Sequence, residues 1–181
     1  ERNMQRRQFL QTSALATALL GGMPLSATAK TAKGKVVVIG GGYGGATAAK
    51  YLRMLSGNQL NVTLVEPNAT FISCPMSNLV VGGLRKISEI STPYTGLARN
   101  HGVKMVKDYV TAIDVEKRTV KLKSGKTLPY DKLVLSPGID LQLDKIEGFA
   151  AANASGQILQ AWKAGPETVG LRKQLEAMPD G

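Results

Sequence analysis

The feature that most constrains the fold is a run of glycines directly after a short apolar segment. Residues 35–39 read Lys-Val-Val-Val-Ile, a β-branched run typical of a buried parallel strand. They lead straight into Gly40-Gly41-Gly42-Tyr43-Gly44-Gly45. This order matches G-x-G-x-x-G, in which the first glycine turns the chain, the second admits a pyrophosphate and the third lets a helix lie close to the strand. The run therefore predicts a strand–turn–helix unit that binds a dinucleotide.

A second strand with an acid at its end strengthens this prediction. Residues 61–65 read Asn-Val-Thr-Leu-Val, and Glu66 follows them, 21 residues after Gly45. A carboxylate there can accept hydrogen bonds from ribose hydroxyls and disfavours a ribose 2′-phosphate, so NADP is not expected. The competing interpretation is a glycine-rich turn and an acid that merely ends a strand. The fingerprint alone leaves FAD and NAD open.

The rest of the chain predicts how the sheet continues. Short strands at 109–115, 118–123 and 126–130 alternate apolar and polar residues, which predicts an antiparallel meander. An apolar strand at 132–136 then ends in Ser136-Pro137-Gly138. We also expect a long loop with a helical turn over 67–92, a linker to about 160, and helices at 94–101 and 166–178. The fold class is therefore α/β, with a doubly wound parallel sheet and a small antiparallel β meander.

The distribution of charge argues against a nucleic-acid site. The formal net charge is +10, but half of it comes from residues 1–35. The later basic residues are scattered and are not interleaved with aromatic side chains. We interpret them as a solvated surface and expect no nucleic-acid partner.

Residues 1–29 read as an export signal. Arg6-Arg7 form a positive start, a mostly apolar stretch follows, and Ala27-Thr28-Ala29 is a cleavage site of the Ala-x-Ala kind. The stretch is too short and too polar to span a bilayer, so no transmembrane segment is expected. The paired arginines resemble a twin-arginine signal, and an ordinary secretory signal is the alternative. Either route predicts a periplasmic protein whose mature chain begins near Lys30.

Cys74 is the only cysteine in the sequence. An unpaired cysteine is unusual in an exported protein, because oxidation threatens it. It could be a buried apolar residue, it could pair with a cysteine beyond residue 181, or it could be bonded to something else. Its position eight residues after Glu66, on the loop that leaves the second strand, favours the last alternative.

The sequence resembles the flavin subunit of flavocytochrome c sulfide dehydrogenase. The likeness lies in the glycine-rich segment, the Glu66-Pro67-Asn68 turn, the Cys74-x-x-Ser77-Asn78 stretch and Ala161-Trp-Lys-Ala-Gly165. It implies the Rossmann-like FAD-binding domain of a two-dinucleotide-binding-domain flavoprotein, with FAD joined to Cys74 by a thioether at the 8α carbon of the flavin. The resemblance and the fingerprint together give these cofactor-binding residues: Gly40, Gly42, Tyr43, Gly44, Gly45, Glu66, Cys74, Val110, Ser136, Pro137 and Gly138.

The same resemblance implies a function and a domain order. Sulfide would be oxidised, and its electrons would pass through FAD to a c-type cytochrome subunit, whose haem lies on another chain because C-x-x-C-H is absent here. Residues 30–145 would form the FAD-binding domain, and 146–181 would be a linker and first helix that lead toward a second dinucleotide-binding domain. The redox-active cysteines of the family would lie beyond residue 181. We expect no catalytic residue and no metal site anywhere in residues 1–181. The alternatives are a sulfide:quinone reductase-like or NADH dehydrogenase-like flavoprotein, or a non-catalytic FAD-binding module.

Replacing Arg6 and Arg7 with lysine tests which export route reads the signal. The twin-arginine receptor distinguishes guanidinium from ammonium, so we expect the Lys-Lys variant to stay in the cytoplasm. A secretory signal that depends on charge alone would tolerate the exchange. Fractionation of the expressing cells and immunoblotting measure the outcome, and normal export of the variant would favour the secretory route.

Overall fold

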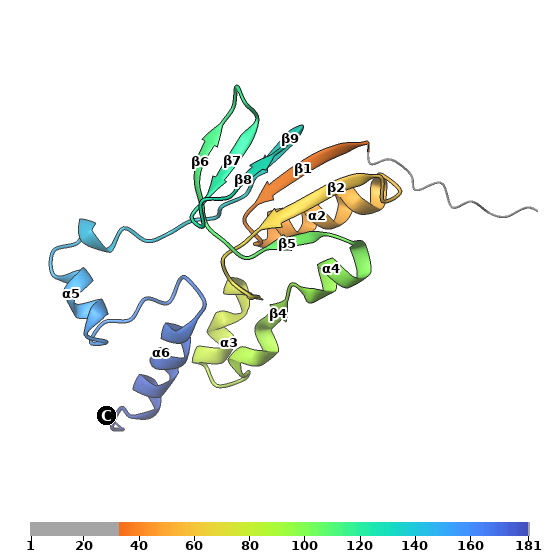
Figure 1. The fold of residues 1–181 in the computed structure, drawn as a ribbon. Helices are drawn as coiled ribbons and strands as arrows, with labels where there is room; N and C mark the ends of the chain where they lie inside the picture. The colour runs from red at the N-terminus through yellow and green to blue at the C-terminus, as the bar shows by residue number, and fades with distance from the viewer. Residues whose placement is uncertain (1–32, 181) are drawn as a thin grey trace, which may run out of the picture. The chain divides into compact units, whose positions relative to one another are not determined.

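Four parallel strands form the centre of the structure, a computed structural model that describes residues 33–180 (Figure 1). The predicted export signal lies outside the described residues. The strand order is β5-β2-β1-β9, so the chain crosses over between neighbouring parallel strands. The strands are β1 (Gly34–Ile39), β2 (Leu60–Val65), β5 (Lys104–Val106) and β9 (Lys132–Leu135). This sheet is the doubly wound parallel sheet that the glycine-rich strand–helix–strand pattern predicts.

The β-branched run of β1 fills both faces of the sheet. Side chains alternate along a strand, so Val36 and Val38 face one layer while Val37 and Ile39 face the other. The first pair packs in a cluster with Ala49 of helix α2 (Tyr43–Leu55). The second pair packs in a separate cluster with residues of the meander, including Val120, Leu122 and Tyr130. Burial on both faces explains why the strand is apolar without interruption.

Arg53, in the last turn of α2, joins three elements. Its Nε donates to the carbonyl of His101 at 2.8 Å, and its Nη1 donates to the carbonyls of Asn58 and Leu60. His101 is the last residue of α4 (Thr95–His101), which ends at Gly102 in the left-handed region, with φ of 63°. The guanidinium therefore ties the end of α2 to the end of α4 and to the start of β2.

The predicted meander is present as a three-stranded antiparallel sheet. It consists of β6 (Val110–Asp114), β7 (Thr119–Leu122) and β8 (Thr127–Pro129), in the order β6-β7-β8. Its buried residues Val120 and Leu122 alternate with exposed Lys121, which is the pattern that the sequence shows. Together with the parallel sheet, the meander confirms the predicted fold class.

The segment 67–92 contains more structure than the predicted loop with one helical turn. Two three-residue strands, β3 (Thr70–Ile72) and β4 (Ser91–Pro93), pair antiparallel. Between them lie η1 (Cys74–Met76), α3 (Ser77–Val81) and η2 (Ile87–Ile90). Strands of three residues carry no readable alternation, and each is fixed by its partner rather than by its own sequence. For this reason the loop prediction was wrong here.

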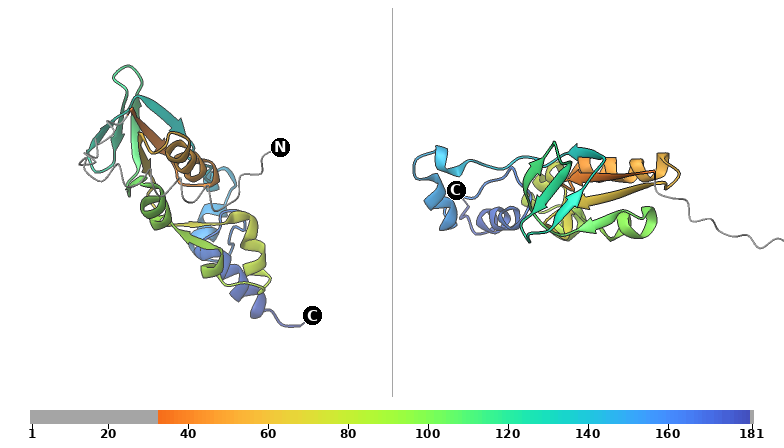
Figure 2. Two further views of the ribbon diagram at one scale, coloured as in Figure 1. Left: turned by 90° about the vertical axis from the view of Figure 1, so that its right-hand side faces the viewer. Right: turned by 45° about the horizontal axis from the view of Figure 1, so that its top comes forward.

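The stretch after β9 also departs from the prediction. A 3-10 turn, η3 (Leu143–Lys145), and helix α5 (Phe149–Ala154) interrupt the predicted linker. The alanine-rich sequence Phe-Ala-Ala-Ala-Asn-Ala could have indicated this helix, because alanine has the highest helix propensity. The predicted helix at 166–178 is present as α6 (Pro166–Glu176), and it packs against α3 (Figures 1 and 2). Within residues 33–180, none of the helices has the length and apolar character needed to cross a membrane.

Candidate functional site

A cleft of about 450 Å³ lies at the carboxyl ends of β1 and β2, beside the turn that follows β9. In open α/β sheets this is the edge where ligands bind. Five of the predicted cofactor-binding residues line it: Gly40, Glu66, Val110, Pro137 and Gly138. Its other lining residues are Ile39, Val65, Pro67, Asn68, Asp108, Tyr109, Ile139, Asp140 and Lys163. The remaining predicted residues lie in the glycine-rich loop, in the turn beneath it, or on the loop that carries Cys74.

The first and last glycines of the fingerprint are required by the packing of the protein itself. Gly40 leaves β1 with φ of 89°, a conformation that side chains other than glycine rarely adopt. A Cβ at Gly45 would lie 1.8 Å from the Gly40 carbonyl oxygen, and one at Gly44 would lie 2.9 Å from Ser136 Oγ. Helix α2 therefore touches the end of β1 and the turn after β9, and no larger residue fits at Gly45.

Gly42 is different, because a Cβ there would meet no atom within 4 Å. It is the N-cap of α2, and its φ of −65° suits any residue. The first amides of a helix have no carbonyl partner in the helix, and the helix dipole makes this end positive. With no acidic residue in its first turn, α2 presents open space and free N–H groups, which suit a phosphate.

Glu66 is buried and already hydrogen bonded on both oxygens. Its Oε2 accepts from the Gly41 N–H at 2.8 Å. Its Oε1 accepts from the backbone N–H and the side-chain amide of Asn68, at 2.8 Å and 2.7 Å. These bonds hold the carboxylate at the wall of the cleft, and Oε2, which accepts only one of them, has a further lone pair that a ribose hydroxyl could use. Asn68 is a functional candidate that sequence reasoning missed, although it belongs to the Glu-Pro-Asn turn.

Cys74 is exposed and begins η1, next to the glycine-rich loop. The neighbouring residue is Ser73, whose Oγ is hydrogen bonded to the hydroxyl of Tyr43 at 2.5 Å. Tyr43 is the first residue of α2. The Tyr43 ring also meets Phe71 edge-on, with centroids 4.7 Å apart. The backbone N–H of Ala164 donates to the Cys74 sulfur at 3.5 Å. The structure thus brings Cys74 beside the segment where a dinucleotide pyrophosphate would lie.

Two residues that line the cleft form an ion pair. Lys163 Nζ lies 3.1 Å from Asp140 Oδ1. The hydrogen bond from Lys163, helped by the Leu141 N–H and by the lysine charge, lowers the pKa of Asp140. Both side chains are exposed, so the pair adds little stability. Neither residue was expected in the site, although Lys163 lies within the Ala161–Gly165 stretch that carries the family resemblance.

Behind the glycine-rich loop lies a buried tyrosine that sequence reasoning also missed. The Tyr94 hydroxyl donates to the Gly41 carbonyl at 2.8 Å. Burial, and secondly the charge of Glu66, raise the pKa of Tyr94 to about 12, so its hydroxyl stays protonated at physiological pH.

Among residues 33–180, no group of three or more His, Cys, Asp or Glu side chains is arranged to hold a metal ion.

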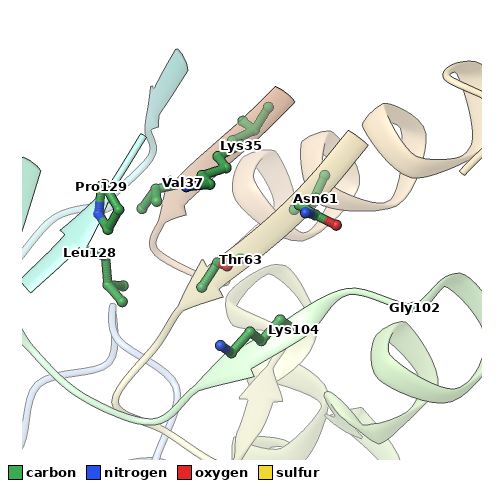
Figure 3. A pocket seen from close by; sticks show the side chains of 10 residues that line it. Lys35, Val37, Asn61, Thr63, Gly102, Lys104, Leu128 and Pro129 are labelled. Atoms are coloured by element: carbon green, nitrogen blue, oxygen red, sulfur yellow. The ribbon is translucent and has the colours of Figure 1, made fainter. Parts of the chain in front are cut away.

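A second hollow, of about 380 Å³, lies on one face of the sheet and is not a good candidate (Figure 3). Lys35, Asn61, Thr63 and Lys104 line it, together with Leu128 and Pro129 of the meander. Lys35 and Asn61 lie opposite each other in the first half of their strands, away from the carboxyl ends. None of the predicted cofactor-binding residues lines it, and we assign it no ligand.

The fold and the cleft define a dinucleotide-binding, Rossmann-like protein. Residues 34–164 match the pyridine nucleotide-disulphide oxidoreductase family, and the chain belongs to that family. The crystal structure of the sulfide:quinone oxidoreductase from Aquifex aeolicus is similar at 30% identity and a TM-score of 0.67, over 78% of this chain and 31% of that one.

Two curated relatives add detail. The mitochondrial sulfide:quinone oxidoreductase of Dictyostelium discoideum is 33% identical over 115 residues, which are 64% of this chain and 25% of that protein. The flavoprotein chain of the flavocytochrome c sulfide dehydrogenase of Chlorobaculum thiosulfatiphilum is 59% identical over 46 residues, 25% of this chain and 94% of that sequence. The resemblance found in the residues is thereby confirmed. The chain spans between 24% and 30% of the length of three sulfide–quinone relatives.

Replacing Glu66 with alanine should weaken dinucleotide binding. A hydrogen bond to a charged group contributes about 1.5–3 kcal/mol, so the affinity for FAD should fall about tenfold or more. Calorimetric titration of the apoprotein measures this in a Cys74→Ala background, where no covalent bond can mask the equilibrium. Glu116→Ala removes an equal charge from an exposed position and should change nothing. An unchanged dissociation constant in the Glu66 variant would mean that the carboxylate does not touch the ribose.

Proposed function

We propose that this chain is the FAD-binding part of a flavoprotein that oxidises sulfide and passes the electrons to a c-type cytochrome subunit. The observation that carries the proposal is the 59% identity to the flavoprotein chain of a flavocytochrome c sulfide dehydrogenase. The more distant relatives are also named for sulfide oxidation, which supports sulfide as the substrate.

We further propose that the protein works in the periplasm, because residues 1–29 have the pattern of an export signal.

The residues of the cleft fit FAD. Glu66 would bind a ribose hydroxyl through Oε2, and the amides at the start of α2 would bind the pyrophosphate. Val110, Pro137 and Gly138 line the same cleft, where their backbone could lie against the adenosine half. When bound, FAD would supply the two-electron chemistry that the side chains of this segment lack.

We propose that Cys74 holds the flavin through a thioether to the 8α carbon. Its exposed sulfur lies one residue from Ser73, which is bonded to Tyr43 at the start of α2. Forming the carbon–sulfur bond would release the thiol proton and one proton of the 8α methyl group. The two electrons so freed would go to the same acceptor that takes the electrons of sulfide.

A quinone is the second candidate for the acceptor. It is favoured by the names of several relatives and of the similar solved structure, which are sulfide:quinone oxidoreductases. The single cysteine argues for the cytochrome, because it stands where the resemblance to the flavocytochrome family implies the attachment site.

Replacing Cys74 with alanine should make the flavin releasable. In the parent protein, flavin fluorescence should stay with the polypeptide through acid precipitation and denaturing gel electrophoresis. In Cys74→Ala the flavin should appear in the supernatant. Pro75→Ala, at the neighbouring exposed position, should keep the flavin attached. Flavin that leaves the parent as easily as the variant would contradict the thioether.

The acceptor can be identified from the protein purified at its natural length. Sulfide should reduce added c-type cytochrome in anaerobic spectrophotometric assays, and the absorbance of a water-soluble ubiquinone should stay constant. Because sulfide gives up electrons in pairs and a haem iron takes one, the cytochrome should be reduced in a molar excess over sulfide consumed. Reduction of the quinone alone would support the second candidate, and reduction of neither would contradict both.

A further inference from the structure

Tyr94 packs directly against the glycine-rich loop, although it is far from it in the sequence. It is the N-cap of α4, and only 8% of it is exposed. Its ring belongs to the apolar cluster on the α2 side of the sheet, with Val36, Val38 and Ala49. A Cβ at Gly41 would lie 2.6 Å from the Tyr94 hydroxyl and 2.7 Å from its Cζ, so glycine is required at position 41. The ring is therefore fixed by packing, and the loop is shaped to meet it.

Both polar backbone groups of Gly41 are held by buried side chains. Its carbonyl accepts from the Tyr94 hydroxyl at 2.8 Å, and its N–H donates to Glu66 Oε2 at the same distance. The two bonds act on different peptide planes, because the N–H belongs to the Gly40–Gly41 peptide and the carbonyl to the Gly41–Gly42 peptide. Tyr94 therefore controls the second plane independently of Glu66.

The orientation of that second plane decides where the Gly42 N–H points. The described peptide bonds contain no cis isomer, and in a trans peptide the N–H points opposite to the carbonyl. With the Gly41 carbonyl bound to Tyr94, the Gly42 N–H points away from the core. The space beside Gly42 is open, and the free amides of the first turn of α2 follow it.

We propose that Tyr94 is a positioning residue for the pyrophosphate of the bound dinucleotide, because its hydroxyl holds the Gly41–Gly42 peptide so that the Gly42 N–H can donate to a phosphate oxygen. This inference rests on the proposed binding of a dinucleotide. It differs from a purely structural role, because it assigns the hydroxyl an effect on the phosphate and none on the nucleoside. A tyrosine that only fills the core would affect every part of the ligand through the stability of the loop.

Comparison of ADP with adenosine separates these two roles. Tyr94→Phe removes the hydroxyl and keeps the ring, and it is made in the full chain with Cys74→Ser so that no flavin is attached. The net loss of one hydrogen bond is about 0.5–1.5 kcal/mol, so affinity for ADP should fall about threefold to tenfold. Affinity for adenosine should stay within about twofold of the parent, since Glu66 still binds the ribose. Tyr51→Phe removes an exposed hydroxyl from α2 and should change neither.

The Gly42 amide gives a direct signal. In ¹H–¹⁵N spectra of the Cys74→Ser parent, added ADP should move the Gly42 resonance downfield, while adenosine should leave it nearly unchanged. In Tyr94→Phe the shift with ADP should be clearly smaller.

Each outcome decides between the proposals. Equal weakening of ADP and adenosine, or no change in either, would overturn the positioning role. A Gly42 resonance that ignores ADP in the parent would overturn it even if the phenylalanine variant failed to fold. If ADP did not bind the parent at all, the proposed dinucleotide site itself would be wrong.

Discussion

The hydrogen bond between the Glu66 carboxylate and the Gly41 N–H joins the two halves of the nucleotide-binding edge. It connects the end of β2 to the loop between β1 and α2 across 25 positions of sequence, and it is buried. Because an unpaired buried carboxylate is costly, the strand end and the loop must fold together. The cleft and the open amides of α2 depend on this closure, because Glu66 lines the cleft and Gly41 directly precedes the N-cap of the helix.

The central strand–helix–strand unit could be predicted because its signals are local. The glycine spacing, the β-branched runs and the acid at the end of β2 each lie within a short window, and the structure has both strands within one residue of the expected bounds. The meander could be predicted for the same reason, from the alternation of apolar and polar residues along its strands. The antiparallel pair of β3 and β4 was not, because pairing between distant short segments leaves no periodic trace in either one.

The site divides in the same way. The residues that the fingerprint names line the cleft or form its loop. The residues that hydrogen bond to this part of the site lie far from their partners in the sequence. The Tyr94–Gly41 bond spans 53 positions, the Tyr43–Ser73 bond spans 30, and the contact of Ala164 with Cys74 spans 90. No local pattern can report such contacts, since each depends on the folded path of the chain. The family resemblance supplies a role for Cys74, and the structure adds the neighbours that surround its sulfur.

The contrast between Gly45 and Gly42 has an evolutionary consequence. Gly45 is fixed by an approach of 1.8 Å to the Gly40 carbonyl, which any Cβ would violate, whether or not a ligand is present. Gly42 has an ordinary φ and empty space beside it, so the fold itself does not require glycine there, and the proposed phosphate contact is what would restrict it. A duplicated copy of this chain that had lost its cofactor would keep glycine at position 45 to remain folded, and it would be free to drift at position 42. The residue found there in a descendant sequence would then distinguish an inherited scaffold from a working site.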